Sequence, residues 1–256
     1  NRKLMQGQRL SLQEEQTFVE EMVNSPQLYE YMLDSSDDYS LYVFIHYMFG
    51  TTYFGMQICP EKSVLIPCFH DEAYLYLRLF RQAYIQARGM IYNAMPEMEL
   101  AGRVYDFSST EQICMGIGMD TELHPDAEAF RKAYHIEKPF LLYAGRKDTG
   151  KNVHTLLRYF AEFKRRQPSD LQLVLIGGGQ IEIPVSVQDD VYDLGFVTAQ
   201  DKYNAMAAAE LLCQPSHNES FSLVIMESWL CGRPVLVHAK CAVTRDFARR
   251  SNGGLY

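Results

Sequence analysis

Apolar runs alternate with amphipathic segments along most of this chain. Continuous runs rich in β-branched and aromatic residues predict strands, and the segments between them have helical spacing. In the first part of the chain we expect strands at 41–48, 63–69, 90–93 and 113–118, with helices at 53–58, 73–88 and 96–105. The run 41–48 is apolar throughout, which predicts a strand buried on both faces of its sheet. Alternating strands and helices predict a parallel sheet with helices on both faces.

The alternation resumes after residues 115–120, a stretch with two glycines that we interpret as a hinge. The pattern therefore predicts an α/β protein with two domains, 1–120 and 121–256. In the second domain we expect helices at 127–134, 152–166, 199–209 and 222–231, and strands at 140–145, 171–176, 191–196, 211–215 and 234–238.

Residues 1–38 precede the first expected strand and have a helical pattern. Ser11 and Glu14 stand at the spacing of a capping box, which predicts a helix that continues to Val23. Pro26 is expected to end that helix, and residues 27–33 are expected to form another.

The composition narrows the class of protein. The formal net charge is −8, and an acidic surface repels the nucleic-acid backbone, so no nucleic-acid partner is expected. Six scattered cysteines without a Cys-x-x-Cys pair are typical of a reduced, cytoplasmic protein. No apolar run has the length of a membrane span, and no signal peptide opens the sequence. The chain starts with Asn1 and lacks an opening strand with a glycine-rich turn, so we expect a piece of a longer protein.

The stretch Glu219–Trp229 carries the strongest functional signal. Two glutamates, Glu219 and Glu227, have seven residues between them. Glu219 follows an expected strand and turn, and Glu227 lies in a helix that Ser220 or Ser222 can cap. Because the first N–H groups of a helix are unpaired and its dipole is positive there, this turn can hold phosphate. A carboxylate beside phosphate is suited to accept hydrogen bonds from sugar hydroxyls, so the stretch indicates a nucleotide-sugar. An ordinary amphipathic helix with two solvated glutamates is the alternative.

This stretch resembles the E-x7-E motif of the family 4 retaining glycosyltransferases, which have the GT-B fold. The resemblance implies two Rossmann-like domains whose parallel sheets face each other across a cleft, with the N-terminal domain incomplete here. It implies that Glu219 contacts the transferred sugar and that Glu227 contacts the ribose. Backbone N–H groups that bind the diphosphate would then come from Phe221, Ser222, Leu223 and Val224. The family's usual Gly-Phe-Gly is replaced here by residues 220–222, Ser-Phe-Ser, which still permit a cap and a tight turn.

A second motif supplies positive charge. Arg146 and Lys151 stand five residues apart in a loop that follows an expected strand and opens a helix. Two cations on such a loop can converge on a diphosphate and stabilise its charge as it leaves. The loop resembles the family's G-R-x(3,4)-K motif, in which these two residues hold the diphosphate. A solvated basic turn is the alternative for this loop taken alone.

Two more strand ends belong to the edge where open α/β sheets bind ligands. Gly177 and Gly178 follow the strand 171–176 and resemble the family's glycine element near the nucleotide. Phe196 and Val197 end the next strand and resemble the stretch that faces the nucleobase. A plain tight turn and a buried strand end are the alternatives.

The candidates in the first domain are His70 and Gly50. His70 ends the strand 63–69 and resembles the family histidine that faces the donor's sugar and phosphate from the other domain. A structural histidine paired with a neighbouring carboxylate is the alternative. Gly50 opens a loop that we assign to the acceptor side, and His46, inside an apolar run, is interpreted as a core residue.

These signals predict a retaining, metal-independent glycosyltransferase that moves a sugar from a UDP- or GDP-sugar, the UDP-sugar being favoured, to a glycan or lipid-linked acceptor. Arg146, Lys151, Glu219 and His70 are assigned as catalytic. No cluster has metal-ligand spacing, and neither a metal nor another cofactor is expected. The alternatives are a non-catalytic nucleotide-sugar-binding protein and another GT-B enzyme, such as an epimerase or a phosphorylase. Basic clusters near 164–166 and 245–250 leave peripheral contact with the inner face of a membrane open, although solvated helix ends are favoured.

Overall fold

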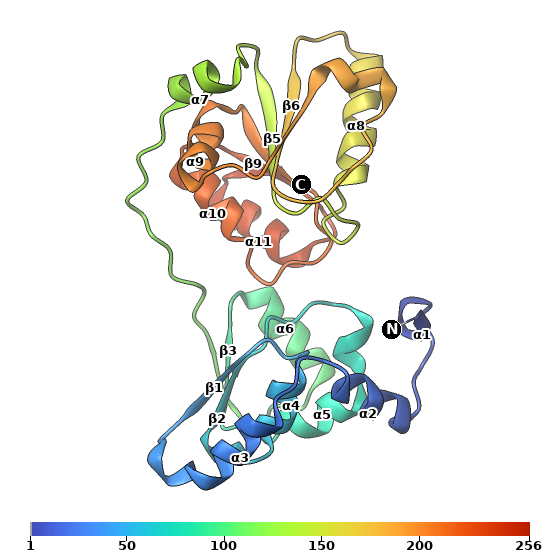
Figure 1. Cartoon of the computed structure of the whole chain (residues 1–256), viewed down its shortest axis with the longest axis vertical. Helices are drawn as coiled ribbons and strands as arrows, with labels where there is room; N and C mark the ends of the chain where they lie inside the picture. The colour runs from blue at the N-terminus through green and yellow to red at the C-terminus, as the bar shows by residue number, and fades with distance from the viewer. Residues whose placement is uncertain (1) are drawn as a thin grey trace. The chain divides into compact units, whose positions relative to one another are not determined.

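The computed structural model of the protein describes residues 2–256 (Figure 1). The chain divides between Ile117 and Gly118 into two compact units, which we call the first and the second unit. The division falls inside the stretch 115–120 that the sequence assigned to a hinge, three residues before the expected boundary at Asp120. Each unit contains a parallel sheet.

Four parallel strands form the sheet of the first unit, in the order β1-β2-β3-β4. They are β1 (Tyr42–Ile45), β2 (Ser63–Ile66), β3 (Gly89–Tyr92) and β4 (Glu111–Cys114). Strands that are consecutive in the chain are neighbours in the sheet, as the alternating pattern predicted. The helices between the strands are α4 (Gly50–Met56), α5 (Arg78–Tyr84) and α6 (Met95–Val104). The expected helix 73–88 is broken at Leu77, whose extended backbone separates the short 3-10 helix η3 (Ala73–Tyr76) from α5.

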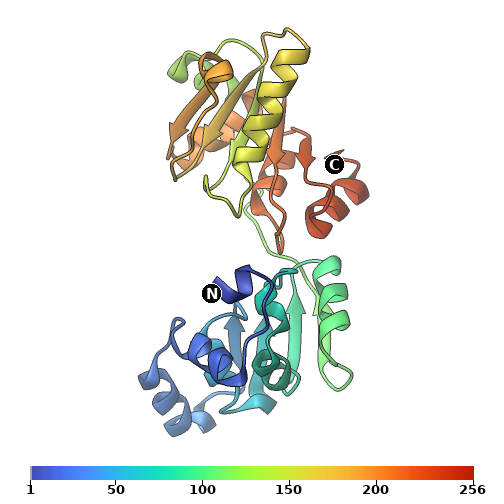
Figure 2. The ribbon, with the colours of Figure 1, turned by 90° about the vertical axis from the view of Figure 1, so that its right-hand side faces the viewer.

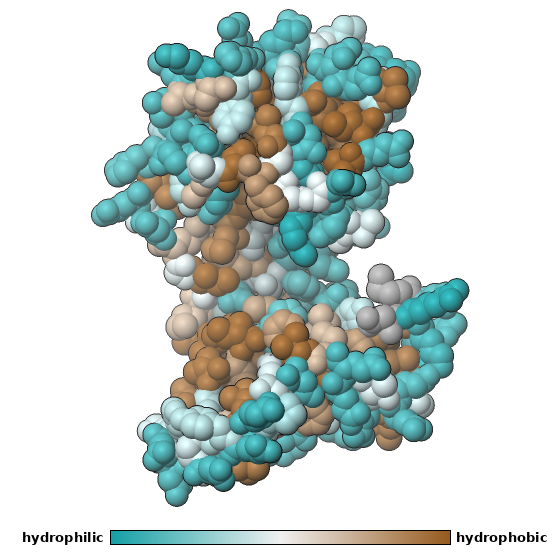
Figure 3. Space-filling model, viewed as in Figure 1, coloured by the Kyte–Doolittle hydropathy of each residue, from teal (hydrophilic) through white to brown (hydrophobic). Residues whose placement is uncertain are grey.

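The prediction that residues 41–48 form a strand buried on both faces is wrong. β1 has four residues, and its side chains alternate between a partly buried face, with Tyr42 and Phe44, and an uncovered face on which Val43 and Ile45 are 53% and 61% exposed. The strand stops at Ile45 because His46 takes a left-handed backbone conformation, with φ 71°. Figure 3 shows the apolar surface on this face of the first unit, in the region of β1.

The first predicted helix before β1 begins at its capping box but ends at Glu20 instead of Val23, and the second begins at Pro26, one residue earlier than expected. α2 (Leu12–Glu20) starts with the expected capping box: Ser11 Oγ accepts from Glu14 N at 3.2 Å, and Ser11 N donates to Glu14 Oε2 at 2.8 Å. α3 (Pro26–Asp34) has Pro26 in its first turn, where proline's missing N–H is tolerated. A short helix, α1 (Arg2–Met5), precedes α2, and a 3-10 turn, η1 (Ser36–Asp38), follows α3.

Six parallel strands form the sheet of the second unit, in the order β10-β9-β8-β5-β6-β7. They are β5 (Phe140–Ala144), β6 (Gln172–Ile176), β7 (Val191–Gly195), β8 (Leu211–Gln214), β9 (Val235–Val237) and β10 (Gly254–Leu255). The chain builds outward from β5 to β7 and then returns, so that β8 pairs with the other side of β5. Such a reversal opens a crevice beyond the carboxyl ends of the two central strands.

Helices cover both faces of this sheet (Figures 1 and 2). Successive side chains of a strand point to opposite faces. Leu142 of β5 lies in a core with Phe130, Met206 and Ile225, whereas the next residue, Tyr143, lies in a second core with residues of α8. The helices on Leu142's side are α7 (Ala127–Tyr134), α9 (Ala199–Ala208) and α10 (Leu223–Leu230), and the helix on the other side is α8 (Val153–Arg166). A further helix, α11 (Ala242–Ser251), was not predicted.

A buried carboxylate ties together the ends of β2 and β3. Glu97, in the first turn of α6, is 1% exposed. Its Oε1 accepts from Phe69 N and its Oε2 from Asn93 N, both at 2.7 Å. Burial raises the pKa of Glu97 to about 7. Glu97 thereby fixes the backbone immediately before His70.

Replacing Glu97 with alanine should destabilise the first unit. The change leaves two buried N–H groups without their acceptor, at about 1–3 kcal/mol each. We expect Glu97→Ala to lower the free energy of unfolding by roughly 2–5 kcal/mol in urea denaturation. Glu99, exposed on the same helix, supplies the control, and Glu99→Ala should change stability by less than about 0.5 kcal/mol. Equal stabilities of the two variants would contradict this account.

Glu97 should also make stability depend on pH. Its pKa in the folded chain, about 7, lies above the ordinary value of 4.5, so the unfolded chain loses this proton first. The contribution of Glu97 to the free energy of unfolding therefore falls as pH rises from about 4.5 to 7. Measured in urea at several pH values, the stability of the wild type relative to Glu97→Gln should decrease across that window. A relative stability that increases with pH would have the wrong sign.

Candidate functional site

The loops after β5, β6 and β7 and the starts of α9 and α10 line one pocket of about 540 Å³ in the second unit. These loops lie at the carboxyl edge of the sheet, where the reversal of strand order predicts a ligand site. Eight residues that the sequence proposed as site residues line this pocket: Arg146, Gly177, Gly178, Phe196, Val197, Leu223, Val224 and Glu227. The structure therefore brings together residues from four separate segments of the sequence.

Lys151 and Glu219 are in direct contact. Lys151 Nζ lies 2.6 Å from Glu219 Oε1, and the two side chains are 25% and 10% exposed. Lys151 follows β5 and Glu219 follows β8, so residues 68 positions apart meet because these two strands are neighbours. Gln214, the last residue of β8, donates through Nε2 to Glu219 Oε1 at 3.4 Å and to Ser222 Oγ at 3.1 Å. Positive and negative charge are thus held side by side at the point where the sheet reverses.

The second glutamate of the motif also has a lysine partner, which the sequence analysis missed. Lys202 Nζ, from α9, lies 2.6 Å from Glu227 Oε1, and both residues line the pocket. Tyr203 OH lies 3.5 Å from the same oxygen. Lys202 stands in an alanine-rich helix and 25 residues before Glu227, so no local pattern marked it.

The expectation that Ser220 or Ser222 caps α10 through its side chain is wrong. Ser222 is the N-cap residue, but its backbone is left-handed, with φ 75° and ψ 76°, and its side chain makes no capping hydrogen bond. Its Oγ instead accepts from Gln214. Consequently neither serine side chain caps the first-turn N–H groups of α10, which include those of Leu223 and Val224.

The glycines after β6 are required by close packing between loops. Gly177 has φ 120°, and a Cβ there would lie 2.1 Å from the carbonyl oxygen of Gly145. Gly177 N donates to Gly195 O at 2.7 Å, which joins the β6 and β7 ends. A Cβ on Gly178 would lie 2.5 Å from the ring of Phe196, which is itself 87% exposed.

Three other predicted residues have different surroundings. Arg146 lines the pocket and is 76% exposed, and its Nε lies 3.5 Å from Asp148 Oδ2 in an ion pair that solvent weakens. The ring of Phe221 packs edge-on against Phe247 of α11, with the ring centroids 5.3 Å apart. In the first unit, His70 Nδ1 lies 3.6 Å from Glu72 Oε1, and this pairing fits the structural alternative while also fixing the ring.

Gly50 does not lie in the expected loop. It is the first residue of α4 and is buried against the end of α2, where a Cβ would lie 2.8 Å from the carbonyl oxygen of Val19. This packing accounts for a glycine at position 50. His46, expected in the core, is half-buried and stacks with the rings of Tyr47 and Phe49.

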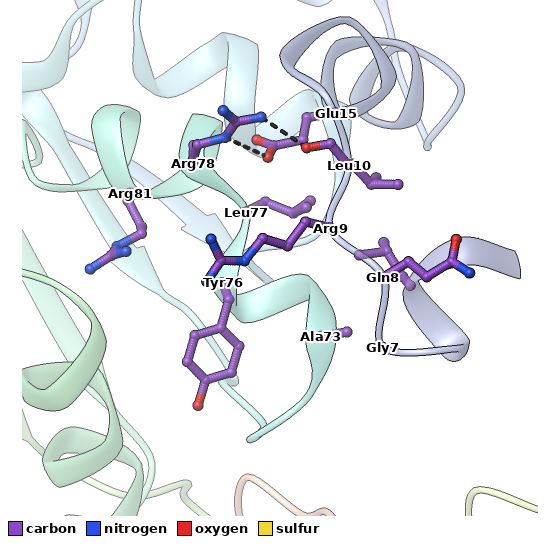
Figure 4. Close-up of a pocket in the computed structure, with 11 residues that line it drawn as sticks. Gly7, Gln8, Arg9, Leu10, Glu15, Ala73, Tyr76, Leu77, Arg78 and Arg81 are labelled. Atoms are coloured by element: carbon purple, nitrogen blue, oxygen red, sulfur yellow. Dashed lines mark hydrogen bonds and ion pairs between the residues drawn. The ribbon is translucent and has the colours of Figure 1, made fainter.

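A second cavity, of about 510 Å³, lies in the first unit and contains none of the predicted site residues (Figure 4). Arg9, Arg78 and Arg81 line it. Arg78 is fixed by Glu15 Oε1 at 3.1 Å and by the carbonyl oxygen of Leu10 at 2.9 Å. Within residues 2–256 the structure offers no group of three or more His, Cys, Asp or Glu side chains arranged for a metal ion. None of the helices in that range combines the length and apolarity that a membrane span requires.

The sequence model of the family described as "Glycosyl transferases group 1" matches residues 126–255. This chain belongs to that family. The match starts at the N-cap of α7 and includes the pocket, the Lys151–Glu219 pair and the Lys202–Glu227 pair.

Two curated relatives are named for sugar transfer. The chain is 32% identical over 174 residues to a D-inositol 3-phosphate glycosyltransferase of Saccharomonospora viridis, covering 60% of this chain and 40% of that protein. It is 29% identical over 197 residues to an N-acetylgalactosamine-N,N'-diacetylbacillosaminyl-diphospho-undecaprenol 4-alpha-N-acetylgalactosaminyltransferase of Campylobacter jejuni, covering 74% of this chain and 52% of that protein. The chain thus spans about half the length of these relatives or less.

Solved structures of similar shape establish the fold of this glycosyltransferase family member. Sucrose-phosphate synthase of Thermosynechococcus elongatus matches with a TM-score of 0.71 and 19% identity, covering 97% of this chain and 67% of that one. Alr3699/HepE of Anabaena, solved with UDP-glucose, matches with a TM-score of 0.70 and 18% identity, covering 92% and 71%. The fold is therefore GT-B, with two Rossmann-like domains, as the sequence predicted.

Adding one methyl group at Gly177 should disrupt the pocket. Gly177→Ala places a Cβ against the Gly145 carbonyl and forces a left-handed conformation on a residue that resists it, so we expect a loss of roughly 2–4 kcal/mol in the free energy of unfolding. Gly118, with no atom within 4 Å of a hypothetical Cβ, is the control. Gly118→Ala should change stability by no more than about 1 kcal/mol. Urea denaturation of both variants measures the two stability losses. Equal losses would show that close packing at Gly177 is not what requires glycine there.

Proposed function

We propose that this chain forms the donor-binding part of a retaining glycosyltransferase that transfers a sugar from a nucleotide-sugar to a glycan or lipid-linked acceptor. The observation that carries the proposal is the contact between Lys151 and Glu219, which do not themselves line the pocket. Gln214 links Glu219 to Ser222, the residue before Leu223, and Leu223 lines the pocket together with Arg146 and Glu227. Cations suited to a diphosphate and carboxylates suited to hydroxyls lie within one site, and a nucleotide-sugar carries both kinds of group.

Departure of the nucleoside diphosphate is the step that needs most assistance. Negative charge develops on the leaving group, and preorganised positive charge lowers the barrier to its departure. Arg146 and Lys151 supply that charge, together with the uncapped N–H groups at the start of α10. Because protein cations fill this role, the proposal requires no metal ion or other cofactor.

The carboxylates orient the donor. Glu219 accepts hydrogen bonds from the transferred sugar, and Glu227 accepts them from the ribose. While no ligand is bound, each carboxylate is neutralised by its lysine, at 2.6 Å in both pairs. When a donor binds, its phosphates compete for Lys151, and the sugar hydroxyls compete for Glu219. The family resemblance also assigns His70 to the donor's sugar, whereas its pairing with Glu72 fits a structural role.

A UDP-sugar is the favoured donor. Among the structures of similar fold, HepE was solved with UDP-glucose, with UDP and glucose, and with UDP. The pneumococcal O-GlcNAc transferase GtfA was solved with UDP and GlcNAc. The relatives' names include a phosphorylated inositol and a diphospho-undecaprenol glycan, which favours a glycan or lipid-linked acceptor. A lipid-linked acceptor would place the reaction at the cytoplasmic face of a membrane.

Donor binding and turnover test the proposal. Calorimetry with UDP, UDP-sugars and GDP-sugars should show saturable binding of a uridine nucleotide. In a donor-hydrolysis or transfer assay, Arg146→Ala and Lys151→Met should lower kcat by about 10²–10³-fold, because charge on the leaving group is stabilised mostly in the transition state. Glu227→Gln should mainly raise KM, since the ribose is bound equally in both states.

Arg158 supplies the matched control for loss of charge. It is exposed on α8 and does not line the pocket, so Arg158→Ala should leave kcat and KM within about twofold of the wild type. Binding of donor without any turnover, in the presence of an acceptor panel, would favour the non-catalytic alternative. Failure to bind any nucleotide would overturn the proposal.

A further inference from the structure

Lys147 is a buried lysine directly beside Arg146. Its side chain is 1% exposed, and its Nζ lies 2.5 Å from Oδ1 of Asp193 in β7, 46 residues further along the chain. An ammonium group without a partner in such surroundings would be strongly destabilising, so the pair must stay closed in the folded chain. Lys147 does not line the pocket, whereas Arg146 does.

The pair joins three loops that carry the pocket. Asp193 Oδ1 also accepts from Gly195 N at 3.1 Å, which ties the pair to the end of β7. Lys147 N donates to Gly178 O at 2.7 Å, which ties the same residue to the glycines after β6. Gly179, with φ 102°, packs so closely on this backbone that a Cβ would lie 2.8 Å from Lys147 O. Lys147 therefore fixes the β5 loop to the loop after β6 and, through Asp193, to the end of β7.

We propose that Lys147 and Asp193 form a positioning pair, which sets the spacing of the β5, β6 and β7 loops and thereby the placement of Arg146, Gly178 and Phe196 around the donor. A charge-assisted hydrogen bond restricts both the distance and the direction between the two groups that it joins, so it restricts the loops that carry them. Reacting groups held by such supports lose rate steeply when displaced by about 1 Å. The role of the pair in donor binding rests on the proposed function. Its role in holding the loops rests only on the contacts within this chain.

Lys164 and Asp190 provide a matched control within the same unit. Their Nζ–Oδ2 distance is 2.9 Å, and their side chains are 14% and 28% exposed, close to the 29% of Asp193. This pair joins α8 to the 3-10 helix η4 (Val185–Asp190), and neither residue lines the pocket. Removing the Lys164–Asp190 pair therefore measures how much stability the second unit loses with any ion pair that does not support the pocket.

Amide hydrogen exchange without ligand tests the positioning directly. In Lys147→Met, the amides of residues 145–148, 177–179 and 195–197 should exchange at least about tenfold faster than in the wild type, because their opening is no longer opposed by the pair. Lys164→Met should leave these three segments unchanged. Unchanged exchange of the three segments in a folded Lys147→Met would overturn the proposal, whether or not the protein binds nucleotides.

Donor kinetics test the consequence for the site. With UDP and the preferred UDP-sugar, Lys147→Met should lower kcat/KM by about tenfold to a hundredfold, and Lys164→Met by less than about twofold. A double variant keeps the proposal testable if Lys147→Met does not fold. Combining Lys147→Met with Asp193→Leu removes both charges and leaves apolar side chains in their place. That variant should fold and still show fast loop exchange and reduced kcat/KM. Wild-type exchange and kinetics in the double variant would show that the pair only fills space, and would overturn the proposal. If the wild type binds no nucleotide, the proposed function is overturned. The hydrogen-exchange result would still decide whether Lys147 and Asp193 position the loops.

Discussion

The pairing of β8 with β5 is the constraint on which this site depends. Strands that follow one another in the chain usually add to the same side of a parallel sheet, but here the fourth strand of the second unit crosses back to the other side of the first. This single reversal places the loop with Lys151 next to the loop with Glu219. Without it, the two motifs would lie at distant positions on the sheet edge, and neither could share a ligand with the other.

Charge compensation is the second feature of the site. In a chain with a net charge of −8, the carboxylates of Glu219, Glu227 and Asp193 each lie within 2.6 Å of a lysine nitrogen. The pairs differ in exposure and therefore in the function they suit. The two partly exposed pairs can open when a ligand offers better partners, whereas Lys147 has no contact with solvent through which to leave Asp193. The same chemical pairing thus occurs in this unit both at partly exposed positions and at a buried one.

The sequence was informative about the fold where strands are buried on both faces. Such strands are apolar throughout, and β5, β6 and β8 were found from that property. The same property misled at β1, because an apolar run does not reveal whether a neighbour covers it. The break at Leu77 was missed because the run 73–88 has a helical pattern on both sides of it. The helix α11 does have a local amphipathic pattern, with Val243, Phe247 and Ala248 at helical spacing, and was left unassigned.

The site was predictable to the extent that its residues follow strands. Arg146, Gly177 and Phe196 come directly after strands, and the parallel topology was enough to bring them together. Lys202, Lys147 and Asp193 depend on contacts between segments 25 and 46 residues apart, and such contacts leave no local pattern. The backbone of Ser222 is left-handed where the family motif has glycine, and that conformation also follows from the surrounding fold, so the expected cap did not form.

The position of β1 has a practical consequence for handling the protein. An apolar edge strand offers its outer backbone groups and its side chains to any other extended segment. The strand β1 lies at the edge of its sheet and exposes Val43 and Ile45. It contains no lysine or proline, the residues that often discourage unwanted pairing at such an edge. The protein will therefore be prone to self-association through this edge, and dilute, cold conditions or a charged residue at position 43 will favour separate molecules.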